Sequence, residues 1–268
     1  MRDIVITIPT INRSTYLLTL ASVTLLDGLD KVEELKVVTL PPKEKDYVNS
    51  VTAKHLYSIL NYYGVKVKIE VQQSKGIGKA RAFQLKGCEG KKVLFIDDDM
   101  IVSHNILDLE KDLTDDIVAV MPKILSNYDP DGLMGKTFIT MNDKLPPNWI
   151  NDKKAKILLP FYNESIKTVF NVLYFMTAMV DLTKLKPDEV KCIIETLSKW
   201  RPDKGYEDRW VGTYLMKRGY KILFDGNYTT YHIFDKSELR CWETEIDYDE
   251  ELNLLSKLAE NPFIEEVK

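Results

Sequence analysis

The sequence predicts a single-domain α/β protein, with a mostly parallel central sheet and helices on both faces of that sheet. Apolar strand patterns alternate with helical patterns along the first half of the chain, and such alternation indicates parallel strands joined by right-handed crossovers. No repeat, low-complexity tract or evident linker divides the 268 residues. A hydrophobic fraction of 44% and a charged fraction of 29% are those of an ordinary globular protein.

The first half contains four strand patterns and three helical patterns. Strands are expected at 3–8, 35–40, 65–72 and 91–96, and helices at 14–28, 46–64 and 78–87. The first helix is expected to bury Leu17, Leu20, Ala21 and Leu25 and to stop at Gly28. In parallel sheets ligands bind outside the carboxyl ends of the strands, and the triplet at 97–99 follows the fourth strand directly.

The second half is less regular. Strands are expected at 116–125, 169–182, 221–225 and 228–234, and helices at 187–200 and 208–217. Residues 126–166 are rich in Pro, Gly, Asn and Asp and are expected to form long surface loops with short strands. The charged tail from 235 contains an amphipathic helix pattern at 249–260, with Leu252, Leu255 and Leu258 near one face.

Charge and cysteine content exclude several classes of protein. The net charge is −4, from 37 basic and 41 acidic residues, with no basic block, so nucleic acid is not an expected partner. Three cysteines without metal-like spacing fit a reduced, cytoplasmic setting. There is no signal peptide pattern, and the apolar stretch at 169–180 is too short to cross a bilayer. Peripheral contact with a membrane stays open.

The triplet Asp97-Asp98-Asp99 is the most informative feature. If it continued the strand, Asp97 and Asp99 would point the same way with Cβ atoms about 7 Å apart. At an effective dielectric of about 20, two such charges repel by roughly 2.5 kcal/mol. An exposed turn or a divalent cation would relieve this repulsion. Because the triplet lies at the expected ligand edge, we favour Mg²⁺ or Mn²⁺, with phosphate oxygens from a nucleoside diphosphate completing its coordination.

A second cluster of polar residues lies near the C-terminal end of the predicted domain. Glu207 and Asp208 begin a predicted helix, where acids commonly act as caps. A general base at this position would need burial to raise its pKa, because the helix dipole lowers it. His232 follows an alternating strand pattern and is either a structural residue or a metal ligand.

Four stretches occur in an order and spacing that resemble a family 2 glycosyltransferase of the GT-A fold. They are "IVITIPTINR", "GIGKARAFQLKGCEGKKVLFIDDDMIV", "FMTAMVDLTKL" and "YEDRWVGTYLMKRGYKILFDGNYTTYH", and together they cover roughly residues 3–234. The resemblance implies a Rossmann-like sheet, a nucleotide-sugar donor and a DXD-type metal site. It divides the domain into a nucleotide-sugar-binding half at 1–115 and an acceptor and catalytic half at 116–234, followed by the tail at 235–268.

The resemblance also implies a role for each matching residue. Pro9, Thr10, Asn12 and Arg13 would hold the nucleoside, and Lys79 and Arg81 would lie near the nucleotide. Asp97 and Asp98 would contact the donor, while Thr177 and Ala178 would line the sugar pocket. Asp99 and His232 would bind Mn²⁺ or Mg²⁺, and Asp208, paired with Glu207, would be the catalytic base.

Two departures limit what the resemblance implies. Family members usually carry an acid after the second strand, which contacts the nucleotide base, whereas this chain has Thr39, Leu40 and two prolines. The identity of the base therefore stays open. Ala82 stands where the family usually has asparagine after the arginine of the third helix.

The expected activity is metal-dependent transfer of a sugar from a nucleoside-diphosphate sugar to an acceptor hydroxyl. Asp208 would accept the proton of that hydroxyl, and a single displacement would invert the anomeric centre. The alternatives are a retaining GT-A enzyme, a nucleotidyltransferase that makes nucleotide sugars, and a non-catalytic binding module. The acceptor, a sugar, glycan or lipid-linked molecule, is expected to contact residues 126–166 and the tail.

Overall fold

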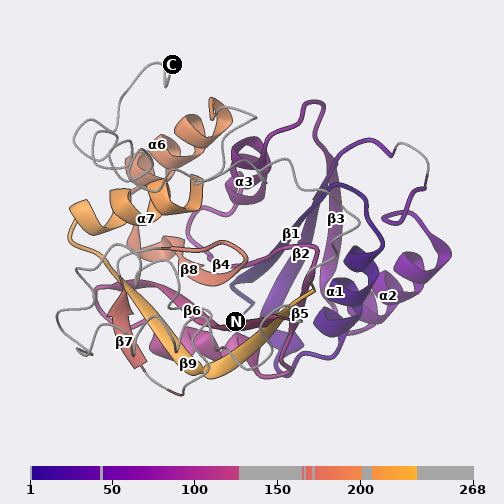
Figure 1. The fold of residues 1–268 in the computed structure, drawn as a ribbon, viewed down its shortest axis with the longest axis horizontal. Helices are drawn as coiled ribbons and strands as arrows, with labels where there is room; N and C mark the ends of the chain where they lie inside the picture. Colours follow the sequence, from indigo (N-terminus) through magenta and orange to yellow (C-terminus); the bar gives the residue numbers. More distant parts are fainter. Residues whose placement is uncertain are drawn as a thin grey trace.

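The fold is described by a computed structural model for residues 2–42, 45–126, 165, 167–170, 173–200 and 207–233. Within these ranges nine strands form one curled, mixed sheet (Figure 1). Eight of them follow the order β3-β2-β1-β4-β8-β6-β9-β5, and β7 pairs with β9 outside this path. Almost all of the predicted loop segment at 126–166, and the tail from 235, lie outside the described residues.

The first half of the sheet is parallel, as predicted. Its strands are β1 (Ile4–Thr10), β2 (Val32–Thr39), β3 (Lys66–Val71) and β4 (Lys92–Ile96). They are connected through α1 (Thr15–Thr24), the short helix η1 (Leu29–Lys31), α2 (Val51–Tyr62) and α3 (Ile77–Leu85). Parallel neighbours need such crossovers because the chain must return to the end of the sheet at which the previous strand began.

The second half of the sheet is mixed. It contains β5 (Met100–Val102), β6 (Ile117–Ser126), β7 (Lys167–Phe170), β8 (Thr177–Asp181) and β9 (Lys221–His232). Its helices are η2 (Ile106–Asp112), η5 (Leu182–Lys184), α6 (Pro187–Ser198) and α7 (Glu207–Lys217). β8 is antiparallel to both β4 and β6, whereas β9 is parallel to β6 and antiparallel to β5.

Three predicted elements differ from the structure. The strand expected at 169–182 is two strands, β7, which ends at Phe170, and β8, which begins at Thr177. The strands expected at 221–225 and 228–234 are one strand, β9, with a shift in register against β6 after Asp225. Asp225 accepts hydrogen bonds from the backbone and side chain of Asn227 at 2.9 and 2.8 Å, so the expected turn is a bulge within one strand.

The buried face of α1 also differs from the prediction. The helix ends at Thr24, and Leu25 is 73% exposed. Leu20 is buried as predicted, and Tyr16 and Val23 complete the buried face. The hydroxyl of Tyr16 lies 2.6 Å from that of Tyr57 on α2, which lets a large polar aromatic pack in the core with its hydroxyl paired.

Helices cover both faces of the sheet, as predicted. One core cluster joins the sheet to α1 and α2, and the other joins it to α3, α6 and α7 (Figure 1). Side chains of β4 alternate between them, since Leu94 belongs to the first cluster and Phe95 to the second. No helix within the described ranges is long and apolar enough to cross a bilayer.

The strand order defines where a ligand can bind. β1 lies between β2 and β4, so the chain passes to one side of β1 and later to the other. A crevice forms at such a switch point, outside the carboxyl ends of the two strands. The loop after β1 and the turn after β4 therefore face the same crevice, and they contain residues 10–13 and 97–99.

Candidate functional site

The three aspartates form a tight turn, which we call the aspartate turn (Asp97–Asp99). The backbone N–H of Met100 donates to the carbonyl of Asp97 at 3.2 Å, and the N–H of Asp97 donates to the carbonyl of Met176 at 2.9 Å. The sequence-based picture of Asp97 and Asp99 side by side on a strand is therefore wrong, because β4 ends at Ile96. The turn gives each carboxylate a different set of partners, which reduces the like-charge repulsion.

Asp98 points back toward the end of β1. Its Oδ2 accepts a hydrogen bond from Thr10 Oγ1 at 2.6 Å, and its Oδ1 accepts one from Arg13 Nε at 2.8 Å. Only 3% of the residue is exposed. Burial raises the pKa of Asp98, and Arg13 and Thr10 counteract part of that rise. Asp98 thus joins the turn after β4 to the loop after β1.

Asn12 shapes the other wall of the crevice. It has a left-handed backbone with φ of 67°, which asparagine tolerates better than most residues. Its side-chain amide donates to the carbonyl of Lys45 at 3.0 Å, and its Oδ1 accepts from the N–H of Tyr47 at 2.7 Å and of Val48 at 3.2 Å. These bonds hold the segment before α2 against the end of β1.

Asp99 and His232 meet on the far side of the turn. His232 Nε2 lies 3.2 Å from Asp99 Oδ2, and Arg13 Nη2 lies 3.2 Å from the same oxygen. The pairing of β5 with β9, with Met100 opposite His232, places the histidine there. The backbone N–H of Ile233 also donates to the carbonyl of Asp99 at 2.8 Å, so both residues are fixed by main-chain contacts.

This pair fits a divalent cation that takes only part of its coordination from protein. Within the described residues, no group of three or more His, Cys, Asp or Glu side chains gathers as a complete metal cage. The Asp99 carboxylate and the His232 imidazole lie in direct contact, however, and both are ligand types that suit Mn²⁺. Mg²⁺ and Mn²⁺ sites of this kind leave positions for water and phosphate oxygens.

Asp97 faces away from that pair and contacts Arg81. Arg81 Nη2 donates to Asp97 Oδ1 at 2.7 Å, Nε lies 3.4 Å from Glu207 Oε1, and Nη1 donates to Gln84 Oε1 at 3.1 Å. Burial alone would lower the pKa of Arg81, but Asp97 and Glu207 raise it above its usual value. Burial raises the pKa of Asp97, and Arg81 offsets part of that effect.

Glu207 and Asp208 are the first residues of α7, as predicted. Asp208 Oδ2 accepts a hydrogen bond from the N–H of Phe175 at 3.4 Å, and its Oδ1 accepts one from the N–H of Arg209 at 2.7 Å. Burial raises the pKa of Asp208, with Arg209 and Arg81 acting against that rise. Burial and the neighbouring Asp208 raise the pKa of Glu207 to about 8.

The other predicted site residues lie in strands or contact residues outside the aspartate turn. Pro9 is buried in β1 opposite Val38. Ala178 lies in β8, fully buried, opposite Phe95 and one residue from the loop that contacts the aspartate turn. Thr177 is its neighbour. Lys79 Nζ donates to Ser74 Oγ at 3.1 Å, and no hydrogen bond or ion pair among the described residues joins it to the aspartates.

Gly78 has a packing role that the sequence did not reveal. A Cβ atom at Gly78 would lie 2.4 Å from Cβ of Trp200. Gly78, in the first turn of α3, therefore allows that helix to approach the segment after α6 closely, and α3 contributes Arg81 to the site. Phe175 and Met176 were also missed, because they contribute backbone groups, which leave no signal in a sequence.

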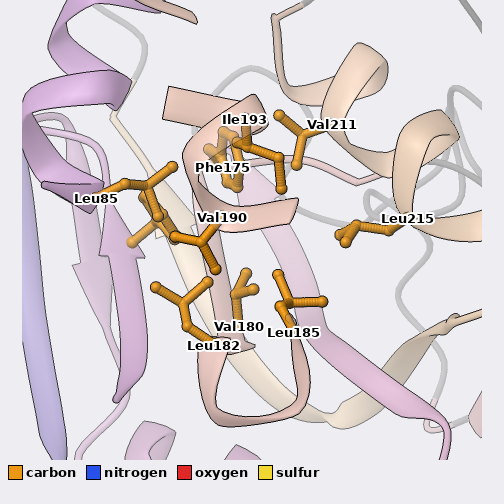
Figure 2. Close-up of a pocket in the computed structure, with 10 residues that line it drawn as sticks. Leu85, Phe175, Val180, Leu182, Leu185, Val190, Ile193, Val211 and Leu215 are labelled. Atoms are coloured by element: carbon orange, nitrogen blue, oxygen red, sulfur yellow. The ribbon is translucent and has the colours of Figure 1, made fainter. Parts of the chain in front are cut away.

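A small apolar cavity lies behind the site. It is enclosed by side chains of α3, β4, β8, α6 and α7, and Figure 2 shows Phe175 and Val211 at one end of it and Leu182 and Leu185 at the other. All ten lining residues are apolar. Such a lining offers no polar group to orient a nucleotide or a sugar, so the cavity is a gap in the core.

The curled, mixed sheet and its helices match the GT-A fold. Among solved structures, GalNAc-T7 with UDP, GalNAc and Mn²⁺ aligns with a TM-score of 0.59 at 14% identity over 87% of this chain and 44% of its own. A mannosyltransferase from Pyrobaculum calidifontis, PcManGT, in complex with GDP-Man and Mn²⁺, aligns with a TM-score of 0.57 at 16% identity, over 90% of this chain and 59% of its own.

A third structure, S. aureus TarS 1-349 in complex with UDP-GlcNAc, has a TM-score of 0.57 at 17% identity, covering 95% of this chain and 66% of that chain. This chain thus spans less than two thirds of the first two structures that it resembles. No protein-family model matches the sequence. No curated protein matches it either. The likeness lies in the fold.

Proposed function

We propose that this protein is a metal-dependent glycosyltransferase that transfers a sugar from a nucleoside-diphosphate sugar to an acceptor hydroxyl. One observation carries the proposal. The aspartate turn, His232 and the acidic start of α7 converge at the switch point of a GT-A type sheet, although they are far apart in the chain. Solved structures of this fold hold UDP or GDP sugars, and two hold Mn²⁺.

In this proposal Asp99 and His232 hold Mn²⁺ or Mg²⁺. The cation, when bound, neutralises charge that develops on the departing diphosphate. Arg13 contacts both Asp98 and Asp99, so it keeps the two carboxylates in place and adds positive charge on the donor side. Residues 1–115 supply most of this half of the site, with Thr10 and Asn12 shaping the place of the nucleoside.

Asp208 is the proposed base for the acceptor. Two backbone N–H groups orient its carboxylate, one from Phe175 and one from Arg209. Burial raises its pKa above the ordinary value of an aspartate, which makes it a better proton acceptor than an exposed carboxylate. Removal of the hydroxyl proton lets the acceptor oxygen attack the anomeric carbon from the face opposite the diphosphate, and the product has inverted configuration.

Calorimetric titration with UDP, GDP and dTDP, each with and without Mn²⁺, tests whether the protein binds a nucleoside diphosphate through a metal ion. It also identifies the nucleotide base of the donor. We expect one nucleotide to bind in a metal-dependent way. Equal binding of all three, or binding of none, would contradict the proposal. Incubation with sugar esters of the preferred nucleotide, followed by detection of released diphosphate, then tests sugar transfer and separates this function from a binding module.

A further inference from the structure

Arg81 occupies the boundary between the donor side and the acceptor side of the proposed site. Its side chain is 3% exposed, and its guanidinium contacts three elements. It meets Asp97 in the aspartate turn, Glu207 at the start of α7 and Gln84 one turn along α3. Gln84 in turn donates to Thr7 Oγ1 of β1 at 3.1 Å, which ties the arginine to the centre of the sheet.

The same guanidinium contacts two residues next to Asp208. Glu207, which lies 3.4 Å from it, precedes Asp208 in the chain. Phe175, whose N–H donates to Asp208, places its ring 5.3 Å from the carbon of the guanidinium. Arg81 therefore contacts the chain neighbour of Asp208 and one of the two residues whose N–H groups orient its carboxylate.

The charges at this boundary depend on Arg81. Asp97, Glu207 and Asp208 are three carboxyl groups around one buried guanidinium. Burial, and then the neighbouring Asp208, raise the pKa of Glu207 to about 8, and Arg81 offsets only part of that rise, so Glu207 retains its proton to a higher pH than an ordinary glutamate. A protonated glutamate still accepts a hydrogen bond through its carbonyl oxygen, so its contact with Arg81 persists at neutral pH.

We infer that Arg81 is a positioning residue that joins the aspartate turn to the first turn of α7 and so places Asp208 for the reaction. Glu207 is also a positioning residue, because its side-chain oxygen is the atom of α7 that Arg81 contacts. This inference rests on the proposed function for the role of Asp208, but the physical link between the two segments does not. A planar guanidinium suits this task because its donors point in fixed, divergent directions.

Hydrogen exchange of the 268-residue chain tests the link itself. In Arg81→Gln, amides at 173–176 and 207–211 should exchange at least about 10-fold faster, because local opening of this segment becomes easier. Arg81→Gln also removes the ion-pair partner of Asp97, so a second variant is needed that keeps Arg81. Glu207→Met keeps the volume but lacks the acceptor oxygen, and it should show the same faster exchange, whereas Glu207→Gln, which keeps the oxygen, should not.

Arg218 provides a control near the opposite end of α7. It lies just beyond the C-terminal end of α7 and pairs with Glu189 at 3.3 Å. Arg218→Gln also removes one arginine and one ion pair, and it should leave exchange at 207–211 unchanged. In steady-state assays, Glu207→Met should show a kcat about 10-fold or more below that of Glu207→Gln, because small misplacements of a base are costly. The affinity for the nucleoside diphosphate should be equal in these two variants.

The outcomes separate this inference from the proposed function. Unchanged exchange at 207–211 in both Arg81→Gln and Glu207→Met would overturn the link. Faster exchange with equal kcat in the two Glu207 variants would overturn its role in placing Asp208. If the parent chain transfers no sugar from any donor, the proposed function fails, while the exchange measurements still decide whether Arg81 holds α7.

Discussion

His232 Nε2 lies 3.2 Å from Asp99 Oδ2, although 133 positions separate the two residues in the chain. Both are almost completely buried. An imidazole and a carboxylate in contact form a hydrogen bond when the facing ring nitrogen is protonated, and small side-chain rotations let both bind a shared cation when it is not. The pair therefore makes the metal proposal directly testable.

His232→Ala should lower the affinity for Mn²⁺, measured in the presence of the preferred nucleoside diphosphate, by about 100-fold, since even indirect metal contacts are worth 10- to 100-fold. His104→Ala is the matched control. His104 Nδ1 also lies within 2.6 Å of an aspartate, Asp27, but both side chains are mostly exposed. Equal Mn²⁺ affinity in the two variants would exclude His232 as a ligand.

Asp208→Asn should bind the donor nucleotide normally and lose transfer activity by about 1,000-fold, within the range of a general base. Asparagine keeps the shape of the side chain but cannot accept the proton of a hydroxyl. Asp188→Asn is the control for effects on helix stability, because Asp188 lies in the first turn of α6. Turnover in Asp208→Asn that matches that of Asp188→Asn would show that Asp208 is not the base.

Local patterns predicted the parallel half of this fold well. Continuous apolar runs defined β1 and β4, and their carboxyl ends define the crevice that contains Asp97–Asp99. The position of Glu207 at the start of α7 was also predictable from the acids that precede an amphipathic pattern. In each case the relevant interactions lie within one element or between an element and its neighbour in the chain.

The partners of the site residues were not predictable in the same way. Asp98 and Thr10 are 88 positions apart, and Arg81 and Glu207 are 126 apart. Such pairs depend on which strands and helices become neighbours in space, and the order of the elements in the sheet leaves no periodic signal in the sequence. The burial of Arg81 likewise results from the meeting of α3 and α7.

Asp98→Asn should lower the free energy of unfolding by about 3 kcal/mol, because it breaks the ion pair between the buried Asp98 and the partly buried Arg13. Thr10→Val removes the hydrogen bond to the other Asp98 oxygen, and a single neutral donor contributes only about 1 kcal/mol. Urea unfolding measures both changes. If the two variants lose the same small amount, Asp98 is not the main link between β1 and β4.

The stability of the protein should fall as pH rises from about 5 to 8, and Glu207 should be responsible for part of that fall. Its pKa is about 8 in the folded protein, against an ordinary value of 4.5. Between these values the unfolded chain releases the proton and the folded protein keeps it, so each increase in pH favours unfolding. Above pH 8 the contribution becomes constant.

Glu207→Gln should remove this component, because glutamine does not titrate. The groups that face Glu207 are Arg81 from α3, Asp97 from the aspartate turn and its neighbour Asp208, and all three remain in the variant. Urea unfolding at pH 5, 7 and 9 should therefore show that the stability of Glu207→Gln, relative to the parent, rises with pH. Parallel pH profiles for the two proteins would mean that Glu207 is ionised throughout, and the account of one guanidinium shared among three carboxyl groups would then be wrong.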